Sequence, residues 1–390
     1  MNLKKNTEGT NKSTHRVIHI VETLDKCAVE NWLVRMMRHA EKKGIALDWT
    51  FFCLEGEGRL ASDIQNLGGQ IIYATTPLSR KRAFCKELRA VLSNGKFDVL
   101  HCHQDLLSAV YLIAAFQLPI RNRIIHIHNA DEVVPVSGKW KQDLLREPLR
   151  RLCWILADKL AGVSAHTIER FRLGRSLRPN RDIVHYYGID FAAAEESVDA
   201  DRDKFRREMK FSSDTTIMLF AGRIDSAKNP LFAFKVFESL AKLDPKIVAI
   251  FAGTGQLAEE LVAMAADSGL NDRFRYLGWR DDARRLMACS DIFILPHVES
   301  PKEGLGLAVV EAQVAGLPVL ISTGVADDPI LQSSAFEKLP LSAGPGFWAK
   351  AALRLLRLPR RSTVEAANAL RASPFDMDFA IKDLQNLHSE

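Results

Sequence analysis

The stretch that decides the fold is DIFILPHVESPKEGLGLAVVEAQVAGLPVLIS, residues 291–322. Its apolar run Ile292–Leu295 is short and predicts a buried strand. A polar loop follows, and then a helix that carries Glu311 and ends near Gly316. A second apolar strand is expected over 319–321. The stretch therefore predicts one strand–loop–helix–strand unit.

Two acidic residues border the loop and the helix of this stretch. Glu303 precedes Gly304 and Gly306, which let the backbone turn sharply and approach a ligand, whereas Glu311 falls in the early turns of the helix. The free amides at a helix start favour anions, and the helix dipole strengthens this preference. Two carboxylates beside an anion site suit a ligand with hydroxyl and phosphate groups, such as a nucleotide sugar. Acidic residues are also common near helix starts, so the spacing alone leaves both interpretations open.

The segment EGLGLAVVEAQVAGLPVLIS, which begins at Glu303, closely resembles the E-x7-E signature of retaining GT-B glycosyltransferases of the family 4 type. It is most similar to the branch that builds bacterial capsular polysaccharides and exopolysaccharides. The resemblance implies that Glu303 contacts the donor sugar and that Glu311 holds the ribose hydroxyls. It also implies that four further residues border the donor: Gly304, Leu305, Gly306 and Leu307.

Arg223 and Lys228 are the cations expected at the same site. They follow a strand-like segment at 216–220, and two cations at this spacing can clamp a diphosphate. Basic residues in a loop are more often only solvated. The segment around them resembles the family's G-R-x5-K-N text, which implies that both bind the donor diphosphate.

Two later loops complete the expected nucleotide-sugar site. Gly253 and Gly255 follow the strand-like segment 247–251, but the third glycine of a dinucleotide fingerprint is absent. They are similar instead to the family's Gly-x-Gly turn beside the nucleotide. Arg280 follows the strand-like segment 273–277, in a loop that cups the base in the family. The resemblance therefore places Gly253, Gly255 and Arg280 at the nucleotide.

Histidines end two predicted strands of the first half. His101-Cys102-His103 and His126-Ile127-His128 each place two imidazoles on one face of a strand, as in some metal sites. No third carboxylate or cysteine ligand is obvious, so we predict no metal. The strand that ends in His128 resembles one that ends near the donor sugar in the family, which implies a catalytic role for His128 and places His103 at the donor site. Histidines satisfied within an interdomain cleft are the alternative, above all for His101 and His126.

The loop between the first strand, Arg16–Val21, and the first helix, 30–40, departs from the family. The family has two glycines at the positions of Cys27 and Ala28, where backbone amides approach the donor phosphate. We expect this loop to close less well on a phosphate.

Strand and helix signals alternate along both halves, which predicts parallel, doubly wound sheets. With the resemblance, the expected fold class is α/β, with two Rossmann-like domains that face each other across a cleft in the GT-B arrangement. The expected divisions are a polar tail (1–14), an acceptor-side domain (15–190), a linker (191–204), a nucleotide-sugar domain (205–373) and a C-terminal helix that returns to the first domain (374–390).

Composition and charge indicate the class of protein and its expected location. The chain of 390 residues is 47% hydrophobic and 26% charged, as in a soluble globular protein, and its six cysteines form no C-x-x-C pair. The polar start and the absence of a long apolar stretch predict a cytoplasmic protein. Residues 1–190 carry 29 Lys and Arg against 20 Asp and Glu, whereas the remainder carries 24 against 28. Without a nucleic-acid motif, the basic half favours an anionic membrane surface as its neighbour.

The helix expected over Lys139–Leu156 has basic and apolar residues and is the candidate for that contact. A packed helix with a solvated basic face is an equal alternative, and Pro148 argues against one long uninterrupted helix.

These observations predict a metal-independent retaining glycosyltransferase. It would move a hexose from a UDP- or GDP-sugar to a lipid-linked or oligosaccharide acceptor in bacterial surface polysaccharide biosynthesis. No cofactor is expected, because the nucleotide sugar is a substrate. The alternatives are a catalytically weak partner that binds nucleotide sugar within an assembly complex, and a UDP-sugar epimerase of the same fold.

Overall fold

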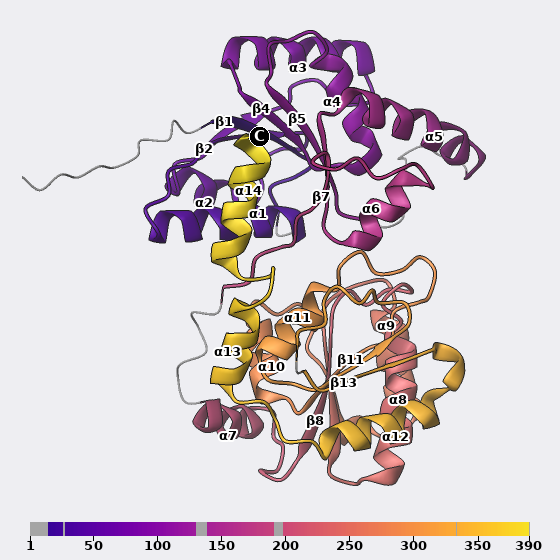
Figure 1. Ribbon diagram of the computed structural model, residues 1–390. Coiled ribbons are helices and arrows are strands. Elements are labelled where there is room, and N and C mark those ends of the chain that lie inside the picture. Colours follow the sequence, from indigo (N-terminus) through magenta and orange to yellow (C-terminus); the bar gives the residue numbers. More distant parts are fainter. Residues whose placement is uncertain (1–14, 26–27, 130–138, 191–197, 333, 390) are drawn as a thin grey trace, which may run out of the picture.

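The protein forms two α/β domains, each built on one parallel sheet (Figure 1). The structure is a computed structural model that describes residues 15–25, 28–129, 139–190, 198–332 and 334–389. Both sheets are doubly wound, which confirms the expected architecture. None of the helices within these ranges is long and apolar enough to cross a membrane.

The N-terminal sheet has the strand order β3-β2-β1-β4-β5-β6-β7. Its strands are β1 (Arg16–Val21), β2 (Asp48–Cys53), β3 (Gln70–Tyr73), β4 (Val99–Cys102), β5 (Asn122–Ile127), β6 (Lys159–Gly162) and β7 (Asp182–Val184). The strands read as apolar runs because helices cover both faces of the sheet. The order reverses between β1 and β4, the switch point at which open α/β sheets bind ligands.

Two apolar clusters fill the two faces of this sheet. One contains residues of α1 (Ala28–Lys42) and α2 (Ala61–Asn66), together with residues of the C-terminal helix. The other contains residues of α3 (Lys81–Gly95), the 3-10 turn η1 (Asp105–Leu107), α4 (Ser108–Ala114), α5 (Lys139–Leu156) and α6 (Ala165–Arg172).

The C-terminal sheet has the order β10-β9-β8-β11-β12-β13. Its strands are β8 (Thr216–Ala221), β9 (Ile247–Ala252), β10 (Phe274–Tyr276), β11 (Ile292–Leu295), β12 (Val319–Ser322) and β13 (Phe336–Leu339). The other elements of this half are α7 (Val198–Glu208), α8 (Pro230–Leu243), α9 (Ala258–Asp267), η2 (Asn271–Arg273), α10 (Ala283–Cys289), α11 (Leu307–Val314), η3 (Leu341–Ala343), α12 (Pro345–Leu356) and α13 (Thr363–Arg371). One apolar core surrounds the sheet.

The last helix, α14 (Met377–Ser389), leaves the C-terminal half and lies on the N-terminal domain (Figure 1). The carbonyl of Leu387 accepts hydrogen bonds from the Asn122 side chain (2.9 Å) and from Lys159 Nζ (3.2 Å). The end of the chain is thereby fixed to β5 and β6 of the first sheet.

One expectation about local structure was wrong. Pro148 does not interrupt α5, which continues from Lys139 to Leu156. Pro148 has no N–H, so the carbonyl of Leu144, four residues earlier, lacks its helical hydrogen-bond donor. Both residues are exposed, and water can therefore supply the missing hydrogen bond. The second part of the expected linker, 191–204, belongs to α7, which begins at Val198, and the domain divisions stay a prediction.

Candidate active site

The start of α6 and the loop before α11 join the two domains. The Ser164 hydroxyl donates a hydrogen bond to the carbonyl of Gly304. Asp328 Oδ1 accepts hydrogen bonds from the backbone N–H of Ala165 and the hydroxyl of Tyr186, each at 2.9 Å. The bond from Ser164 holds the loop that contains Glu303 against the N-terminal domain, and the bonds to Asp328 hold the loop after β12 against the same domain.

Glu303 lies in the loop between β11 and α11, and its backbone N–H donates to the carbonyl of Gly324 (2.8 Å). Its carboxylate contacts Lys228 directly and lies 3.4 Å from Nε2 of His297. Burial opposes ionisation of this carboxyl, but Lys228 and His297 outweigh that effect and hold its pKa below the ordinary value. Glu303 is therefore an ionised acceptor at neutral pH. Gly306, at φ 78°, is the N-cap of α11, a backbone conformation that favours glycine.

The loop after β8 supplies the cations. Asp225 organises it, since its carboxylate accepts the backbone N–H of Lys228 (2.9 Å) and pairs with Arg223 (2.9 Å). The side chain of Arg223 is 73% exposed, whereas that of Lys228 is 15% exposed. The structure thus brings Lys228 and Glu303 together. Arg223, in the same loop as Lys228, is exposed, and its long side chain can reach a bound anion.

Gly253 and Gly255 let two loops pack backbone against backbone. A Cβ at Gly253 would lie 1.8 Å from the carbonyl oxygen of Gly222, and one at Gly255 would lie 2.3 Å from that of Ile224. The N–H of Ile224 donates to the carbonyl of Thr254 (2.9 Å). This packing accounts for both glycines without a ligand, and their expected place beside a nucleotide stays a prediction.

Arg280 is already paired in this structure. Its guanidinium donates to both carboxylate oxygens of Asp282, at 2.7 and 2.6 Å. The neighbouring Trp279 is 54% exposed. The Arg280 side chain is therefore oriented along its own loop, and its expected contact with a base stays a prediction.

Glu311, on α11, faces the N-terminal domain. Its carboxylate lies 3.4 Å from the guanidinium of Arg35 on α1, and both side chains are partly buried. A ligand that takes hydrogen bonds from Glu311 would have to share it with Arg35 or displace it. The first loop, in which Cys27 replaces a family glycine, lies outside the described residues at positions 26–27.

His128 follows β5 and is joined to the interior rather than to Glu303. Its Nδ1 lies 2.5 Å from the Tyr187 hydroxyl, and its Nε2 lies 3.1 Å from Nδ1 of His103. Its backbone N–H donates to Asp105 (2.8 Å). Burial, with His103 and His185 nearby, lowers the pKa of His128 well below its ordinary value, so the ring is neutral. A neutral imidazole can donate or accept a hydrogen bond but brings no charge to the site.

The sequence interpretation missed two residues of this site. His297 is a buried contact of Glu303, and Arg35 is the cation at Glu311. His297 lies just after β11, within residues 291–322, so the sequence could have indicated that it belongs to the site. Arg35 is separated from Glu311 by 276 residues and gave no local signal.

Family models match both halves of the chain. The model described as Glycosyltransferase Family 4 matches residues 29–193, and the model described as Glycosyl transferases group 1 matches residues 201–326. Together with the two parallel sheets, these matches define the class: the chain is a glycosyltransferase with the GT-B fold, of the group 1 and family 4 type.

Particular relatives agree with this class. The chain is 26% identical over 388 residues to the putative glycosyltransferase EpsF of Bacillus subtilis, which covers 97% of both chains. It is 24% identical over 261 residues to the UDP-Gal:alpha-D-GlcNAc-diphosphoundecaprenol alpha-1,3-galactosyltransferase of Escherichia coli, which covers 63% of this chain and 64% of that one. Among solved structures, Anabaena Alr3699/HepE in complex with UDP and glucose superposes with a TM-score of 0.75 at 16% identity, covering 96% of this chain and 100% of that one.

Proposed function

We propose that the protein is a retaining hexosyltransferase that uses a UDP- or GDP-sugar and acts in the assembly of a bacterial surface polysaccharide. The observation that carries this proposal is the direct contact of Lys228 with Glu303 beside the start of α11. A cation for a diphosphate and an acceptor for sugar hydroxyls thereby meet at one point.

In this proposal the chain stabilises the leaving group electrostatically. The diphosphate gains negative charge as the glycosidic bond breaks, and Lys228, Arg223 and the amides after Gly304 supply the positive partners. Lys228 would move from Glu303 to the diphosphate, which frees the carboxylate for the sugar. These groups make a catalytic metal unnecessary. Attack on the same face as the departing nucleotide, the family's proposed route, would retain the anomeric configuration.

The names of the relatives support the donor and the acceptor. The Escherichia coli relative is named for UDP-Gal and for a diphosphoundecaprenol-linked sugar, and HepE was solved with UDP. We therefore expect a UDP-sugar rather than a GDP-sugar, and a lipid-linked acceptor.

Calorimetry with a panel of UDP-, GDP- and ADP-sugars and free nucleotides tests the donor. We expect one donor to bind and its sugar to appear on a lipid-linked acceptor with the anomeric configuration of the donor. Absence of any binding heat would refute the proposal. Binding without transfer would favour the catalytically weak partner, and a new sugar nucleotide without acceptor would indicate an epimerase.

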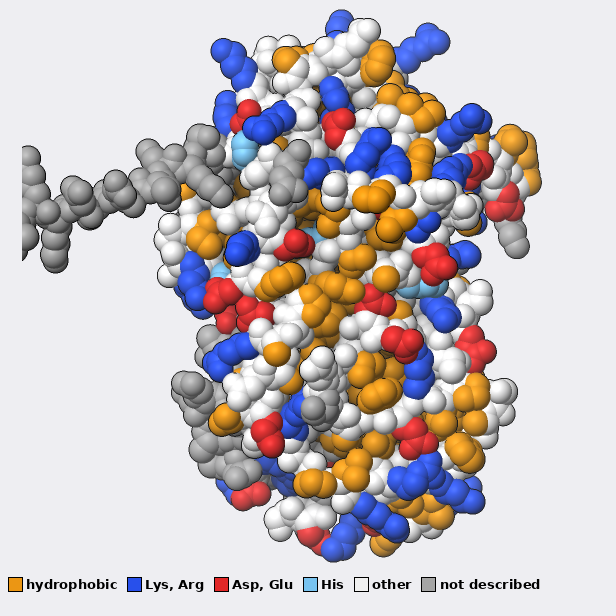
Figure 2. Space-filling view, viewed as in Figure 1, with side chains coloured by type: hydrophobic (Ala, Val, Ile, Leu, Met, Phe, Trp, Pro, Cys, Tyr) orange, Lys and Arg blue, Asp and Glu red, His pale blue; other side chains and the backbone are white. Residues whose placement is uncertain are grey.

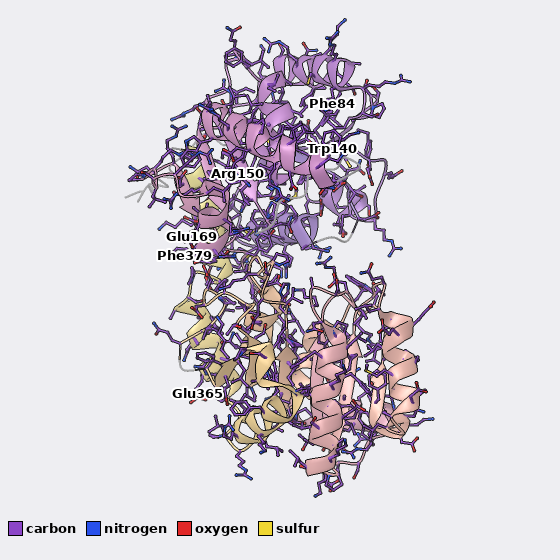
Figure 3. The ribbon with its side chains drawn as sticks, turned by 90° about the vertical axis from the view of Figure 1, so that its right-hand side faces the viewer. Phe84, Trp140, Arg150, Glu169, Glu365 and Phe379 are labelled. Atoms are coloured by element: carbon purple, nitrogen blue, oxygen red, sulfur yellow. The ribbon has the colours of Figure 1, made fainter. Side chains whose placement is uncertain are left out.

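We further propose that α5 lies on the anionic membrane that holds the acceptor. Trp140 and Leu144 on α5 are 66% and 64% exposed, and Phe116, after α4, is 54% exposed. Figure 3 labels Trp140 on α5, and Lys and Arg side chains are spread over the same domain at the top of Figure 2. Trp140→Ala with Leu144→Ala should reduce flotation with anionic vesicles, whereas Phe347→Ala, an exposed aromatic of the other domain, should not. Equal flotation of both variants would argue against this surface.

A further inference from the structure

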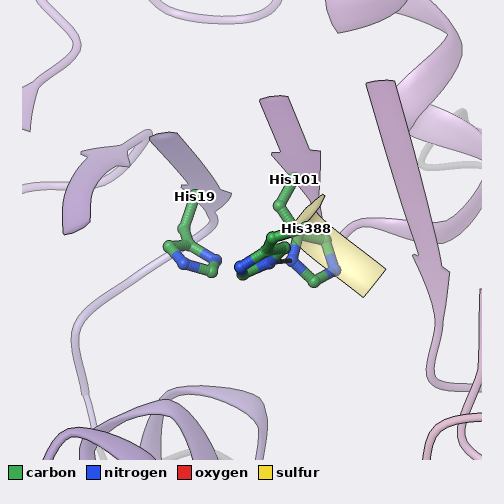
Figure 4. A group of neighbouring side chains, drawn as sticks. All are labelled: His19, His101 and His388. Atoms are coloured by element: carbon green, nitrogen blue, oxygen red, sulfur yellow. Dashed lines mark hydrogen bonds between the residues drawn. The ribbon is translucent and has the colours of Figure 1, made fainter. Parts of the chain in front are cut away.

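Imidazole rings fill the centre of the N-terminal domain, between its sheet and α14 (Figure 4). His19 on β1 and His101 on β4 are register partners, so both side chains leave the sheet on the same face. His388 on α14 approaches the same point from the end of the chain. The exposures of His19, His101 and His388 are 0%, 0% and 4%. This cluster lies apart from Glu303 and Lys228, and the proposed reaction does not use it.

The rings are joined to one another by hydrogen bonds. Nδ1 of His101 lies 3.0 Å from Nε2 of His388, and Nε2 of His101 lies 3.2 Å from Nδ1 of His126. Nδ1 of His19 lies 3.0 Å from Nε2 of His103. Nε2 of His19 is buried and has no hydrogen-bond partner among the described residues. A buried, unpaired ring nitrogen is costly unless something binds it.

One consistent set of neutral tautomers turns these rings into ligands. If Nδ1 of His19 carries the proton, it donates to His103, and Nε2 of His19 presents a lone pair. If Nε2 of His101 carries the proton, it donates to His126, and Nδ1 of His101 presents a lone pair towards His388. In His19 and His101 the nitrogen opposite the lone pair is then held by a hydrogen bond, as in metal sites whose outer partners fix the tautomer, and the bond between His101 and His388 is the one that a metal would replace.

We propose that His19, His101 and His388 bind one transition-metal ion of the Zn²⁺ type. One ring nitrogen from each lies within 4.8 Å of the others, a separation that a small rearrangement converts into metal–nitrogen bonds of about 2.0–2.1 Å. Three neutral imidazoles and a water complete a tetrahedral site, and an all-nitrogen ligand set selects zinc, cobalt, nickel or copper over magnesium or calcium.

A second group, His101, His103 and His126, also brings three ring nitrogens within 4.8 Å. Both nitrogens of His103 are already bonded there, one to His19 and one to His128. A metal at this second group would have to break one of those bonds. With the unpaired Nε2 of His19 as a ligand atom, the first group gives up only the contact between His101 and His388, and it is therefore the better site.

The metal would act as a structural clamp. It would join the last turn of α14 to β1 and β4, which are separated from His388 by most of the chain. Because all three rings are buried, the ion would enter during folding or when the end of α14 lifts. Metal binding free energy would then add to the stability of the docked helix.

The test uses the full chain without a polyhistidine tag, stripped with a chelator and titrated with Co²⁺. We expect one equivalent of cobalt with the visible spectrum of a tetrahedral site, displaced by Zn²⁺, and a higher melting temperature with metal. His388→Gln and His19→Gln should each weaken cobalt binding by more than about 100-fold, because loss of an outer partner alone costs about 10- to 100-fold. His126→Gln removes such an outer partner and should keep the stoichiometry.

His39→Gln is the matched control. His39 contacts Asp378 of α14 (2.6 Å), so its loss loosens the helix without removing a ligand, and cobalt binding should persist. Failure of the parent chain to bind one equivalent of cobalt or zinc would overturn the proposal without any variant. Binding by His388→Gln as tight as that of the parent, or loss of binding in His39→Gln alone, would overturn the assignment of the ligands.

Discussion

The two halves of the molecule use the same kind of sheet but fill it with different chemistry. In the C-terminal half, Phe220 and Phe251 are register partners on β8 and β9, and their rings stack with centroids 5.2 Å apart. In the N-terminal half, His19 and His101 are register partners on β1 and β4, with centroids also 5.2 Å apart. Both pairs are fully buried.

The contrast between the phenylalanine pair and the histidine pair shows which buried side chains the fold needs and which it does not. A phenylalanine pair is held by burial and ring contact alone, whereas a buried imidazole must find partners for two nitrogens. The C-terminal half shows that a parallel sheet of this type needs no histidine in its core. The polar interior of the N-terminal half is therefore an addition to the fold, and its side chains are candidates for function.

The largest expected effect is on the apolar interior. Phe251→Ala should lower the free energy of unfolding by about 3–5 kcal/mol, because it removes a buried ring and leaves a cavity. Chemical denaturation followed by circular dichroism measures the change. Phe347→Ala, an exposed ring of the same domain, is the control and should change stability little. A small effect at Phe251 would mean that this core tolerates cavities and that the contrast between the halves is weaker than we infer.

At the active site, Lys228→Ala should reduce kcat roughly 100- to 1000-fold, the usual cost of one lost electrostatic partner of a developing anion. Steady-state transfer from the donor identified by calorimetry measures it. Lys235→Ala removes an exposed lysine of α8 in the same domain and should leave turnover unchanged. Activity of Lys228→Ala within a few-fold of the parent would exclude its assigned role.

Glu30, on α1, tests the polar interior of the first half. Burial, with Glu22 and Asp25 nearby, raises the pKa of its carboxyl to about 7. At low pH such a carboxyl is protonated in both the folded and the unfolded state, and it then does not lower the free energy of unfolding. The cost appears as the pH rises above the ordinary carboxyl pKa and is complete once the pH exceeds about 7.

Glu30→Gln should therefore stabilise the protein by about 3 kcal/mol at about pH 8 and by almost nothing at about pH 4, at roughly 1.4 kcal/mol per pKa unit. Denaturation at both pH values measures the difference. An equal effect of the substitution at the two pH values would show that Glu30 is not held neutral by its surroundings.

The smallest effect is expected at the glycine loops. Gly253→Ala places a Cβ against the Gly222 carbonyl and should cost about 1–3 kcal/mol of stability while weakening donor binding. Gly346→Ala is the control, because an added Cβ there meets nothing within 4 Å. Melting curves and donor calorimetry measure both. Unchanged donor affinity in Gly253→Ala would show that this loop packing does not shape the donor site.

Local patterns predicted much of the fold. The bounds of β1, β11 and α5 were predicted as the structure has them, because apolar periodicity fixes a strand or a helix within a few residues. Lys228 and Glu303 were expected at the same site from the family resemblance, and the structure adds their direct contact, because both loops follow neighbouring parallel strands and so open at the same edge of one sheet. The continuity of α5 through Pro148 was not predicted, because it depends on the solvent exposure of Pro148 and Leu144, which the sequence alone does not reveal.

The sequence by itself determined the order of strands and helices, the loop before α11 that contains Glu303, and the family resemblance. Each of these features depends on residues that lie close together along the chain. Only the tertiary structure decided which distant side chains meet. His101 and His388 are separated by 287 residues, and Arg35 and Glu311 by 276, so no spacing along the chain predicts either contact. The metal site proposed above takes only His101 from the His-x-His pairs, and its other two histidines, His19 and His388, come from the first strand and the last helix, which meet only when the chain folds back on its first domain.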